Sequence, residues 1–195
     1  DPAKLNDLEI AHAAYVAGNI DIRNAHLALA LSDDPKIREF AALMISDHEA
    51  VNEAALALLQ KLKAEPQDNA FSQALMKGAK DNWAKMATLS GKDFDKSYAA
   101  NELAYHQTVN KVVGDAFIPN VENGELKTLL GSALDTFQAH EKHAAQMVAE
   151  KVVKNITVDG GKVTVEVELG YPTKSHVADL GAKKKKKVAA IAGVK

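Results

Sequence analysis

The chain has 195 residues and no cysteine, and this absence excludes several kinds of site. Without cysteine the protein has no disulfide framework, no thiolate metal ligand and no thiol nucleophile. Aromatic residues make up only 5% of the sequence while alanine is abundant, which indicates helices packed closely through small side chains. The formal net charge of −2 gives no general reason to expect a nucleic acid as partner.

The motifs of several enzyme classes are also missing. There is no Gly-x-Ser-x-Gly motif and no phosphate-binding loop, so we expect no nucleotide or organic cofactor. The zinc-protease pattern His-Glu-x-x-His starts at His48 but has Asn52 in place of its second histidine. A di-iron carboxylate bundle takes Glu-x-x-His from two helices, whereas this chain has that spacing only from Glu9 to His12. An oxygen-activating di-iron oxidase is therefore not expected.

The first three quarters of the chain read as a succession of helices, and no apolar run approaches the roughly 18 residues that span a bilayer. Asn6 and Glu9 form a capping-box pattern, and Asp34 followed by Pro35 is a second helix start. We expect helices at about 7–31, 35–63, 69–88, 93–118 and from the segment NVENGEL to about 150. The short connections place successive helices antiparallel. The fold class is therefore all-α, an antiparallel bundle of four long helices with one extra shorter helix.

The character of the sequence changes near residue 151. The segment NITVDGGKVTVEVELGYP alternates polar and β-branched residues around Asp-Gly-Gly, which predicts a β-hairpin. The remaining residues predict a lysine-rich helix. We therefore expect two parts, a helical bundle at 1–150 and a small appendage at 151–195.

A repeated polar pair interrupts the apolar stripes of the long helices. His48 and Asn52 recur as His106 and Asn110 in the pattern His-x-x-Val-Asn, and His140 interrupts the last long helix. The midpoints of antiparallel helices lie at one level. Asp21, His48 and His106 fall within a residue or two of their midpoints, and His140 is about three residues off, roughly 5 Å along its helix. Three histidines and one or two carboxylates are thus expected to meet inside the bundle.

Neutral imidazoles with a carboxylate suit zinc, iron or copper, and bundle cores are where such sites are built. We expect His48, His106 and His140 to be the metal ligands, with Glu102 or Asp21 supplying oxygen. Glu102 precedes His106 by one helical turn, so both can address one centre. The sequence offers further candidates: His143 as an additional ligand, and Asn52 and Asn110 as residues that hold the ligands in place.

Three interpretations of these histidines remain open. The first, which we favour, is a non-catalytic bundle that binds a transition metal. The second is a structural or interaction module whose histidines form a hydrogen-bonded core layer without metal. The third is a redox enzyme with a mononuclear metal, which would need an open coordination position and a substrate-sized cavity.

Four segments carry a resemblance to a known bacterial family: LNDLEIAHAAYVAGNIDI, IREFAALMISDHEAVN, FDKSYAANELAYHQTVN and FQAHEKHAAQM. Over about residues 4–150 the chain resembles a ferritin-like helical domain of unknown function, found in secreted or periplasmic proteins often labelled outer-membrane proteins. The resemblance implies a ferritin-like four-helix bundle outside the cytoplasm, in metal handling or envelope stress. The chain begins at Asp1 rather than methionine, which is consistent with removal of a signal peptide.

The appendage resembles something different. VVKNITVDGGKVTVEVELGYPTKSHVADL looks like part of the N-terminal domain of Mrp-type iron–sulfur carrier ATPases, without that domain's first helix and strand. The run Lys183–Lys187 is a candidate contact for an envelope protein or an anionic surface, although such runs are usually solvated. The sequence leaves open whether the chain forms homo-oligomers and whether residues 151–195 belong naturally to the bundle.

Overall fold

The computed structural model describes residues 1–159 and 162–167. Its elements are, in chain order, η1 (Pro2–Lys4), α1 (Asp7–Leu31), α2 (Pro35–Leu62), α3 (Ala70–Met86), α4 (Gly91–Val112), η2 (Val113–Phe117), α5 (Ile118–Asn120), α6 (Gly124–Val152), β1 (Val153–Asp159) and β2 (Lys162–Val167). The chain divides into two compact units, Asp1–Val148 and Ala149–Lys195. The predicted lysine-rich helix, including Lys183–Lys187, lies outside the described residues.

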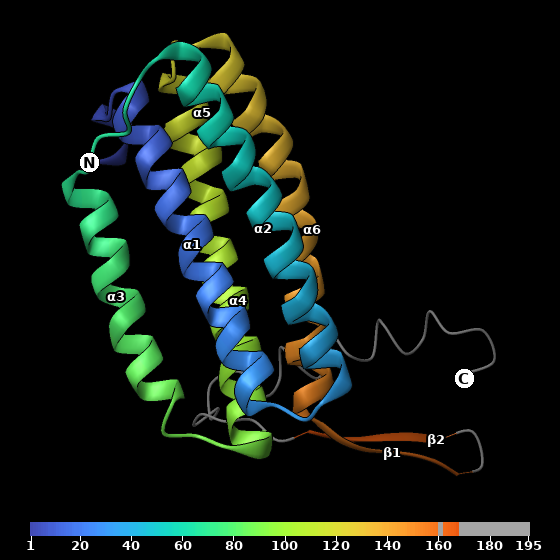
Figure 1. The fold of residues 1–195 in the computed structure, drawn as a ribbon. Coiled ribbons are helices and arrows are strands. Elements are labelled where there is room, and N and C mark those ends of the chain that lie inside the picture. The colour runs from blue at the N-terminus through green and yellow to red at the C-terminus, as the bar shows by residue number, and fades with distance from the viewer. Residues whose placement is uncertain (160–161, 168–195) are drawn as a thin grey trace. The chain divides into compact units, whose positions relative to one another are not determined.

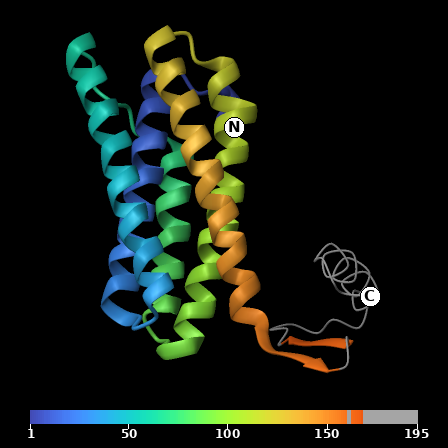
Figure 2. The same cartoon turned by 90° about the vertical axis from the view of Figure 1, so that its right-hand side faces the viewer.

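The first unit is all-α, as the sequence predicts. The long helices α1, α2, α4 and α6 run alongside one another, and the shorter α3 lies along the outside of α1 (Figures 1 and 2). The connection from α1 to α2 is short, α3 lies in the connection from α2 to α4, and η2 and α5 lie between α4 and α6. The bundle therefore brings the middles of helices distant in sequence to the same level.

Local capping fixes where the first two long helices begin. The Asn6 side chain accepts hydrogen bonds from the amides of Leu8 and Glu9, and the Glu9 carboxylate accepts from the amide of Asn6. Asp34 caps α2 in the same manner, and Pro35 occupies its first turn. Each cap satisfies amide groups that have no partner within the helix. Both predicted helix starts are confirmed.

The apolar core falls into two clusters, one toward each end of the long helices. One cluster is built around Ile37, Phe40, Met44, Phe94, Tyr98, Ala144 and Met147. The other is built around Ile10, Ala13, Leu59, Val113, Phe117, Leu126 and Leu130. Along each long helix the two clusters are separated by a buried polar stretch, for example at Asp21 in α1 and His48 in α2. The bundle thus has a polar level between two apolar ends.

The end of the fourth predicted helix differs from the expectation of a continuous helix up to Pro119. Residues Val113–Phe117 form a wider π-helical turn, in which the amide of Ile118 donates to the carbonyl of Val113, five residues back. Pro119 has no N–H to continue the α-helical ladder, and a change of hydrogen-bond register precedes it. Periodicity alone does not reveal such a turn.

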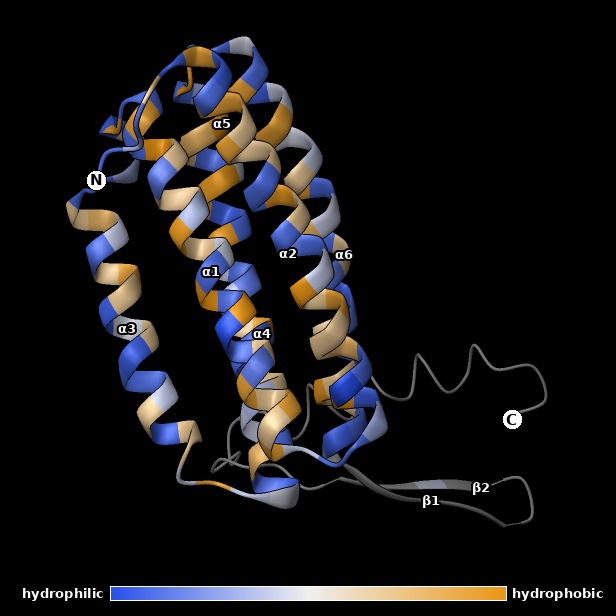
Figure 3. Cartoon of the chain, viewed as in Figure 1, coloured by the Kyte–Doolittle hydropathy of each residue, from blue (hydrophilic) through white to orange (hydrophobic). Residues whose placement is uncertain are grey.

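In the second unit, β1 and β2 pair antiparallel, with Thr157 opposite Thr164 and Val158 opposite Val163. The pairing is irregular between Val153 and Asn155. Among the described residues, no helix combines the length and apolar character needed to cross a membrane. Figure 3 shows hydrophilic residues along every helix of the first unit.

Candidate metal centre

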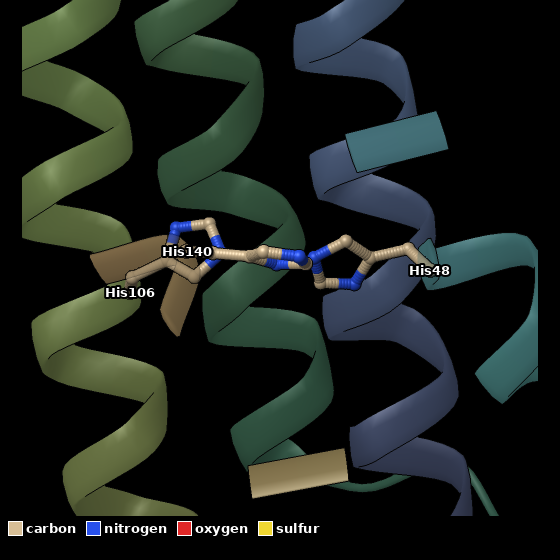
Figure 4. Close-up of side chains that lie close together, drawn as sticks. All are labelled: His48, His106 and His140. Atoms are coloured by element: carbon tan, nitrogen blue, oxygen red, sulfur yellow. The ribbon is translucent and has the colours of Figure 1, made fainter. Parts of the chain in front are cut away.

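Five polar side chains from four helices meet at the polar level of the bundle. They are buried, each with at most 4% of its surface exposed: Asp21 of α1, His48 of α2, Glu102 and His106 of α4, and His140 of α6. Figure 4 shows the three imidazole rings at one level, with His48 pointing toward the other two. The structure thus brings together the three histidines and both carboxylates singled out in the sequence.

These side chains form two overlapping groups of potential ligands. One ligand atom each from His48, His106 and His140 lie within 4.8 Å of one another, and the same holds for Asp21, Glu102 and His106. His106 belongs to both groups. Each group is compact enough for a single ion to contact all three of its members after small side-chain adjustments.

The backbone fixes which nitrogen of His106 faces this centre. Its Nδ1 lies 2.9 Å from the carbonyl oxygen of Glu102. A carbonyl only accepts, so Nδ1 carries the proton and Nε2 presents its lone pair. Nε2 lies 3.2 Å from Oδ2 of Asp21. Nε2 is therefore the nitrogen that His106, which belongs to both ligand groups, offers to an ion.

A carboxylate fixes His140 in the opposite tautomer. Its Nε2 lies 2.8 Å from Oδ2 of Asp47, which accepts the Nε2 proton. The remaining lone pair is on Nδ1, a buried atom without a hydrogen-bond partner among the described residues. A histidine whose other nitrogen donates to a carboxylate is the usual arrangement at metal sites, because the carboxylate sets the ring's orientation.

His48 is held by packing. Its ring stacks on Phe137 with ring centres 4.2 Å apart and planes 11° from parallel. Nε2 lies 2.8 Å from Oδ2 of Asp21, yet in the described part of the chain neither ring nitrogen makes a directed hydrogen bond. A neutral imidazole carries a proton on one nitrogen and a lone pair on the other, so this ring has one nitrogen that can bind an ion.

The two carboxyl groups are driven to different protonation states. Burial raises the pKa of Asp21, but the charges that His48 and His106 carry when protonated lower that pKa by more, so it ends well below its usual range. Burial and the nearby Asp21 charge raise the pKa of Glu102 well above its ordinary value. In the metal-free protein these opposite shifts favour the ionised form of Asp21 and the protonated form of Glu102.

Burial also favours the neutral form of His106 and His140. Burial lowers the pKa of His106, an effect that the Asp21 charge opposes only in part. Burial also lowers the pKa of His140, against the opposing effect of the hydrogen bond that it donates to Asp47. Neutral imidazole is the form that binds a metal ion.

The sequence-predicted supporting residues tie helices together. Asn110 donates to the carbonyl oxygen of Phe137 at 3.1 Å and to the Glu141 carboxylate at 3.0 Å, joining α4 to α6. Asn52 donates to Asn19 on α1 at 3.2 Å. These hydrogen bonds go to the neighbouring helix and not to an imidazole. They join the helices that carry the candidate ligands.

One predicted candidate lies apart from the two ligand groups. The ring of His143 packs edge-to-face on Phe40, with ring centres 5.0 Å apart, and is half-buried among apolar side chains. His143 is one turn beyond His140, at the level of the adjacent apolar cluster. The structure thus separates it from His48, His106 and His140.

Three residues around the centre were missed in the sequence. Asp47 precedes His48 directly, but its side chain points toward α6. Asn24 and Asn101 both donate to Oε1 of Glu102, at 3.0 and 3.3 Å. Asn24 stands three residues after Asp21, a helical spacing that was the available signal for it. For Asp47 and Asn101, only the packing of the helices reveals the role.

The fold is shared with a protein whose structure is known. The chain is similar to CopM in its Ag-bound form, with a TM-score of 0.58 and 18% identity over 75% of this chain and 98% of that chain. CopM in the Cu(II)-bound form and CopM in the apo form each give a TM-score of 0.57 and 17% identity with the same coverage. At such identity the likeness concerns the fold alone.

Comparison with sequence families gives two matches, and no curated protein matches significantly. Residues 132–195 match the model described as iron-sulfur cluster assembly protein, in line with the resemblance seen in the tail. That match covers about a third of the chain. Residues 1–147 match the model described as Domain of unknown function (DUF4142), which covers most of the chain and agrees with the ferritin-like resemblance. The chain therefore belongs to the DUF4142 family.

Proposed function

We propose that this protein is a non-catalytic, ferritin-like metal-binding bundle that holds one transition-metal ion at the polar level, coordinated by His48, His106 and His140 with Asp21. One observation carries the proposal: buried ligand atoms converge without hydrogen-bond partners. Among the described residues these atoms are Oδ1 and Oδ2 of Asp21, Nδ1 and Nε2 of His48, Oε2 of Glu102, Nε2 of His106 and Nδ1 of His140.

The energetic cost of such atoms argues for a cation. A buried polar atom without a partner costs about 1–3 kcal/mol, and native structures rarely contain many of them together. A hydrogen-bonded core layer would also give the second nitrogen of His106 and of His140 a donor, and among the described residues neither has one. Nε2 of His106 lies 3.2 Å from Oδ2 of Asp21, and a ligand atom of His140 lies within 4.8 Å of ligand atoms of His48 and His106. A cation would satisfy the lone pairs and the carboxylate at once.

The donor set indicates the class of metal. Imidazole nitrogens with a carboxylate suit zinc, copper or iron, and the absence of thiolates makes the site moderately hard. Copper is the first metal to test, because the similar structures of CopM include Cu(II)- and Ag-bound forms. Asp21 would supply a negatively charged oxygen to the bound ion, and the imidazoles would set the directions of its other bonds. Asp47 orients His140.

The space beside the centre supports binding over catalysis. The cavity that reaches Asp21, His48 and His106 has a volume of about 40 Å³ and a mostly apolar lining. Pockets that take a substrate-sized molecule usually have roughly 300–1,000 Å³. A metal-handling role outside the cytoplasm is the function we propose for the whole protein, in keeping with the family resemblance.

The test is metal loading of protein prepared without a histidine tag. Protein incubated with excess Cu(II), and separately with zinc and iron, is desalted and its metal content measured by plasma mass spectrometry. We expect about one ion per chain and a melting temperature that rises with metal, since free metal at 100 times Kd adds about 2.7 kcal/mol. Near-complete loss of loading is expected in the double variant His48→Ala, His106→Ala.

The matched control is His26→Ala, which removes an exposed histidine from α1. It should load metal like the unaltered protein. Full metal loading by the double variant would overturn the proposed site. A wild-type protein that neither binds nor is stabilised by any of the three metals would make the histidines a structural layer.

A further inference from the structure

The proposed centre raises the question of how an ion reaches it. Its five polar residues are almost completely buried, so an arriving ion must travel through the interior. Moving a bare ion into an apolar medium costs tens of kcal/mol. A usable route must therefore be lined by polar atoms or be wide enough to keep the ion hydrated.

Two possible approaches to the centre do not meet this requirement. The cavity beside Asp21, His48 and His106 is narrow, and beyond these residues it is lined mainly by alanine, valine, leucine and phenylalanine. The approach from α2 and α6 is closed by the hydrogen bond between Asp47 and His140. An ion entering there would have to break the contact that orients its own ligand.

The pocket beneath α3 is wide enough for an ion that keeps its hydration shell. This pocket lies between α1, α3 and α4 and has a volume of about 280 Å³. At roughly 30 Å³ per water molecule, it has room for an ion with its hydration shell. Its lining includes the amide side chains of Asn24, Asn82 and Asn101 together with Tyr105.

The amides form a connected path from the surface to the centre. Asn82 on α3 is exposed and donates to Oδ1 of Asn101 at 3.1 Å. Asn101 is half-buried and donates to Oε1 of Glu102 at 3.3 Å, where buried Asn24 also donates at 3.0 Å. Glu102 in turn shares a ligand group with Asp21 and His106. Exposure falls step by step along this path toward the centre.

The sequence of α3 explains why the space exists. Small residues, Ala74, Gly78 and Ala79, line the pocket from the middle of α3. The helix is held nearer its ends, where the ring of Phe71 packs on Phe117 and the Trp83 indole donates to Asn24 at 2.6 Å. A side chain at Gly78 would meet nothing within 4 Å. The middle of α3 therefore spans the pocket without filling it.

We propose that the pocket beneath α3 is the passage through which a hydrated transition-metal ion enters and leaves the buried centre. The inference rests on the proposed metal-binding function and concerns the rates of binding and release. A passage affects both rates equally and leaves the affinity unchanged, because it contributes nothing to the bound state.

The test fills the passage without touching a ligand. Gly78 lines the pocket and a Cβ there meets nothing within 4 Å, so Gly78→Leu adds a bulky side chain at the pocket wall. Gly131→Leu makes the same change on α6, where the glycine also has nothing within 4 Å and does not line the pocket. Trp83 is the only tryptophan, and quenching of its fluorescence by Cu(II) reports binding in a stopped-flow instrument. Release is followed by transfer of Cu(II) to excess EDTA.

We expect Gly78→Leu to slow association and release alike, each by about tenfold or more, because the ion must wait for α3 to move aside. The dissociation constant should stay unchanged, and Gly131→Leu should match the wild type. Rates in Gly78→Leu equal to those of the wild type would overturn the passage while leaving the centre intact. If the wild type binds no metal, the proposed function itself is wrong.

Circular dichroism and melting curves establish that Gly78→Leu is folded. Should it fail to fold, Ala74→Leu fills the same pocket from an exposed position one turn earlier. The same slowing of both rates is then expected, and unchanged rates in that variant would overturn the passage equally.

Discussion

Nε2 of His140 on α6 lies 2.8 Å from Oδ2 of Asp47 on α2, and this contact leaves Nδ1 as the nitrogen that faces the bundle interior. His106 also has one nitrogen left without a hydrogen bond, but in the opposite tautomer. Its Nδ1 donates to the backbone carbonyl of Glu102, so Nε2 is the nitrogen that carries the lone pair. Two histidines on different helices are thus oriented by partners outside the centre. Such partners are a feature of metal sites, where they fix the direction of the lone pair.

Removal of the Asp47 carboxylate should therefore weaken metal binding without touching a ligand. For Asp47→Ala we expect the dissociation constant for Cu(II) to rise about 10- to 100-fold, the usual effect of losing a ligand's orienting partner. Competition with a chelator of known affinity measures it. Glu49→Ala is the matched control, since it removes an exposed carboxylate from the same helix. An equal effect in both variants would mean that only surface charge was lost.

The two buried carboxyl groups should respond differently to amide substitution. Burial and Asp21 raise the pKa of Glu102 and so favour its protonated form. Glu102→Gln should therefore change the unfolding free energy by less than about 1 kcal/mol. Asp21→Asn removes the ionised group beside His48 and His106 and should lower metal affinity far more than Glu102→Gln does. Urea unfolding and metal titration of both variants measure this. Equal losses of affinity would contradict the assigned protonation states.

The pH dependence of stability in the metal-free protein should reveal the buried His140. Its pKa is lowered in the folded state, chiefly by burial. Below about pH 6.5 this histidine is therefore protonated in the unfolded chain but still neutral in the folded chain. The free energy of unfolding then falls as the pH drops through about 6.5 toward the folded pKa. Above that window the effect disappears.

Glu102 titrates with the opposite sign, because its raised pKa stabilises the folded state at low pH and that contribution is lost as the pH rises. The informative quantity is therefore the difference between the wild type and His140→Gln. We expect the wild type to lose more stability than the variant between pH 7 and pH 5 in urea unfolding at each pH. Parallel profiles would show that His140 titrates alike in both states.

Close packing of α1 on α2 depends on a glycine. A Cβ at Gly18 would lie 2.5 Å from Oδ1 of Asn52, so Gly18→Ala forces the amide away from its hydrogen bond with Asn19. We expect a loss of about 1–3 kcal/mol in unfolding free energy, as for other overpacked interiors. Gly78→Ala, where the new methyl meets nothing, should instead stabilise by about 0.4–1 kcal/mol. Thermal and urea unfolding of both variants measure these changes. A Gly18→Ala variant as stable as the wild type would show that α2 and its Asn52 side chain can move away from α1 without cost.

Much of the fold follows from local signals in the sequence. The capping residues Asn6 and Asp34 set two helix starts, and the apolar periodicity defines the long helices. Because antiparallel helices share a midpoint level, counting from the helix ends also places Asp21, His48 and His106 together, as the structure has them. Those features depend on spacing along one helix, which a sequence contains.

The rest depends on how helices pack, which spacing does not encode. Asp47 lies about 100° around the helix from His48, off the apolar stripe, and becomes relevant only because α6 brings His140 to it. The tautomers follow from such contacts. The same holds for Asn101, which gains its role from Glu102 and from the α3 residue Asn82.

The most direct test of the central claim is to locate the ion. Crystals of the Cu(II)-loaded protein, with diffraction measured above and below the copper absorption edge, give its position from anomalous scattering. We expect one strong peak at the polar level, about 2.0–2.1 Å from Nε2 of His106 and bonded to His48 and His140. A peak only at exposed histidines such as His26, or no peak in protein saturated with copper, would contradict a buried metal centre in this bundle.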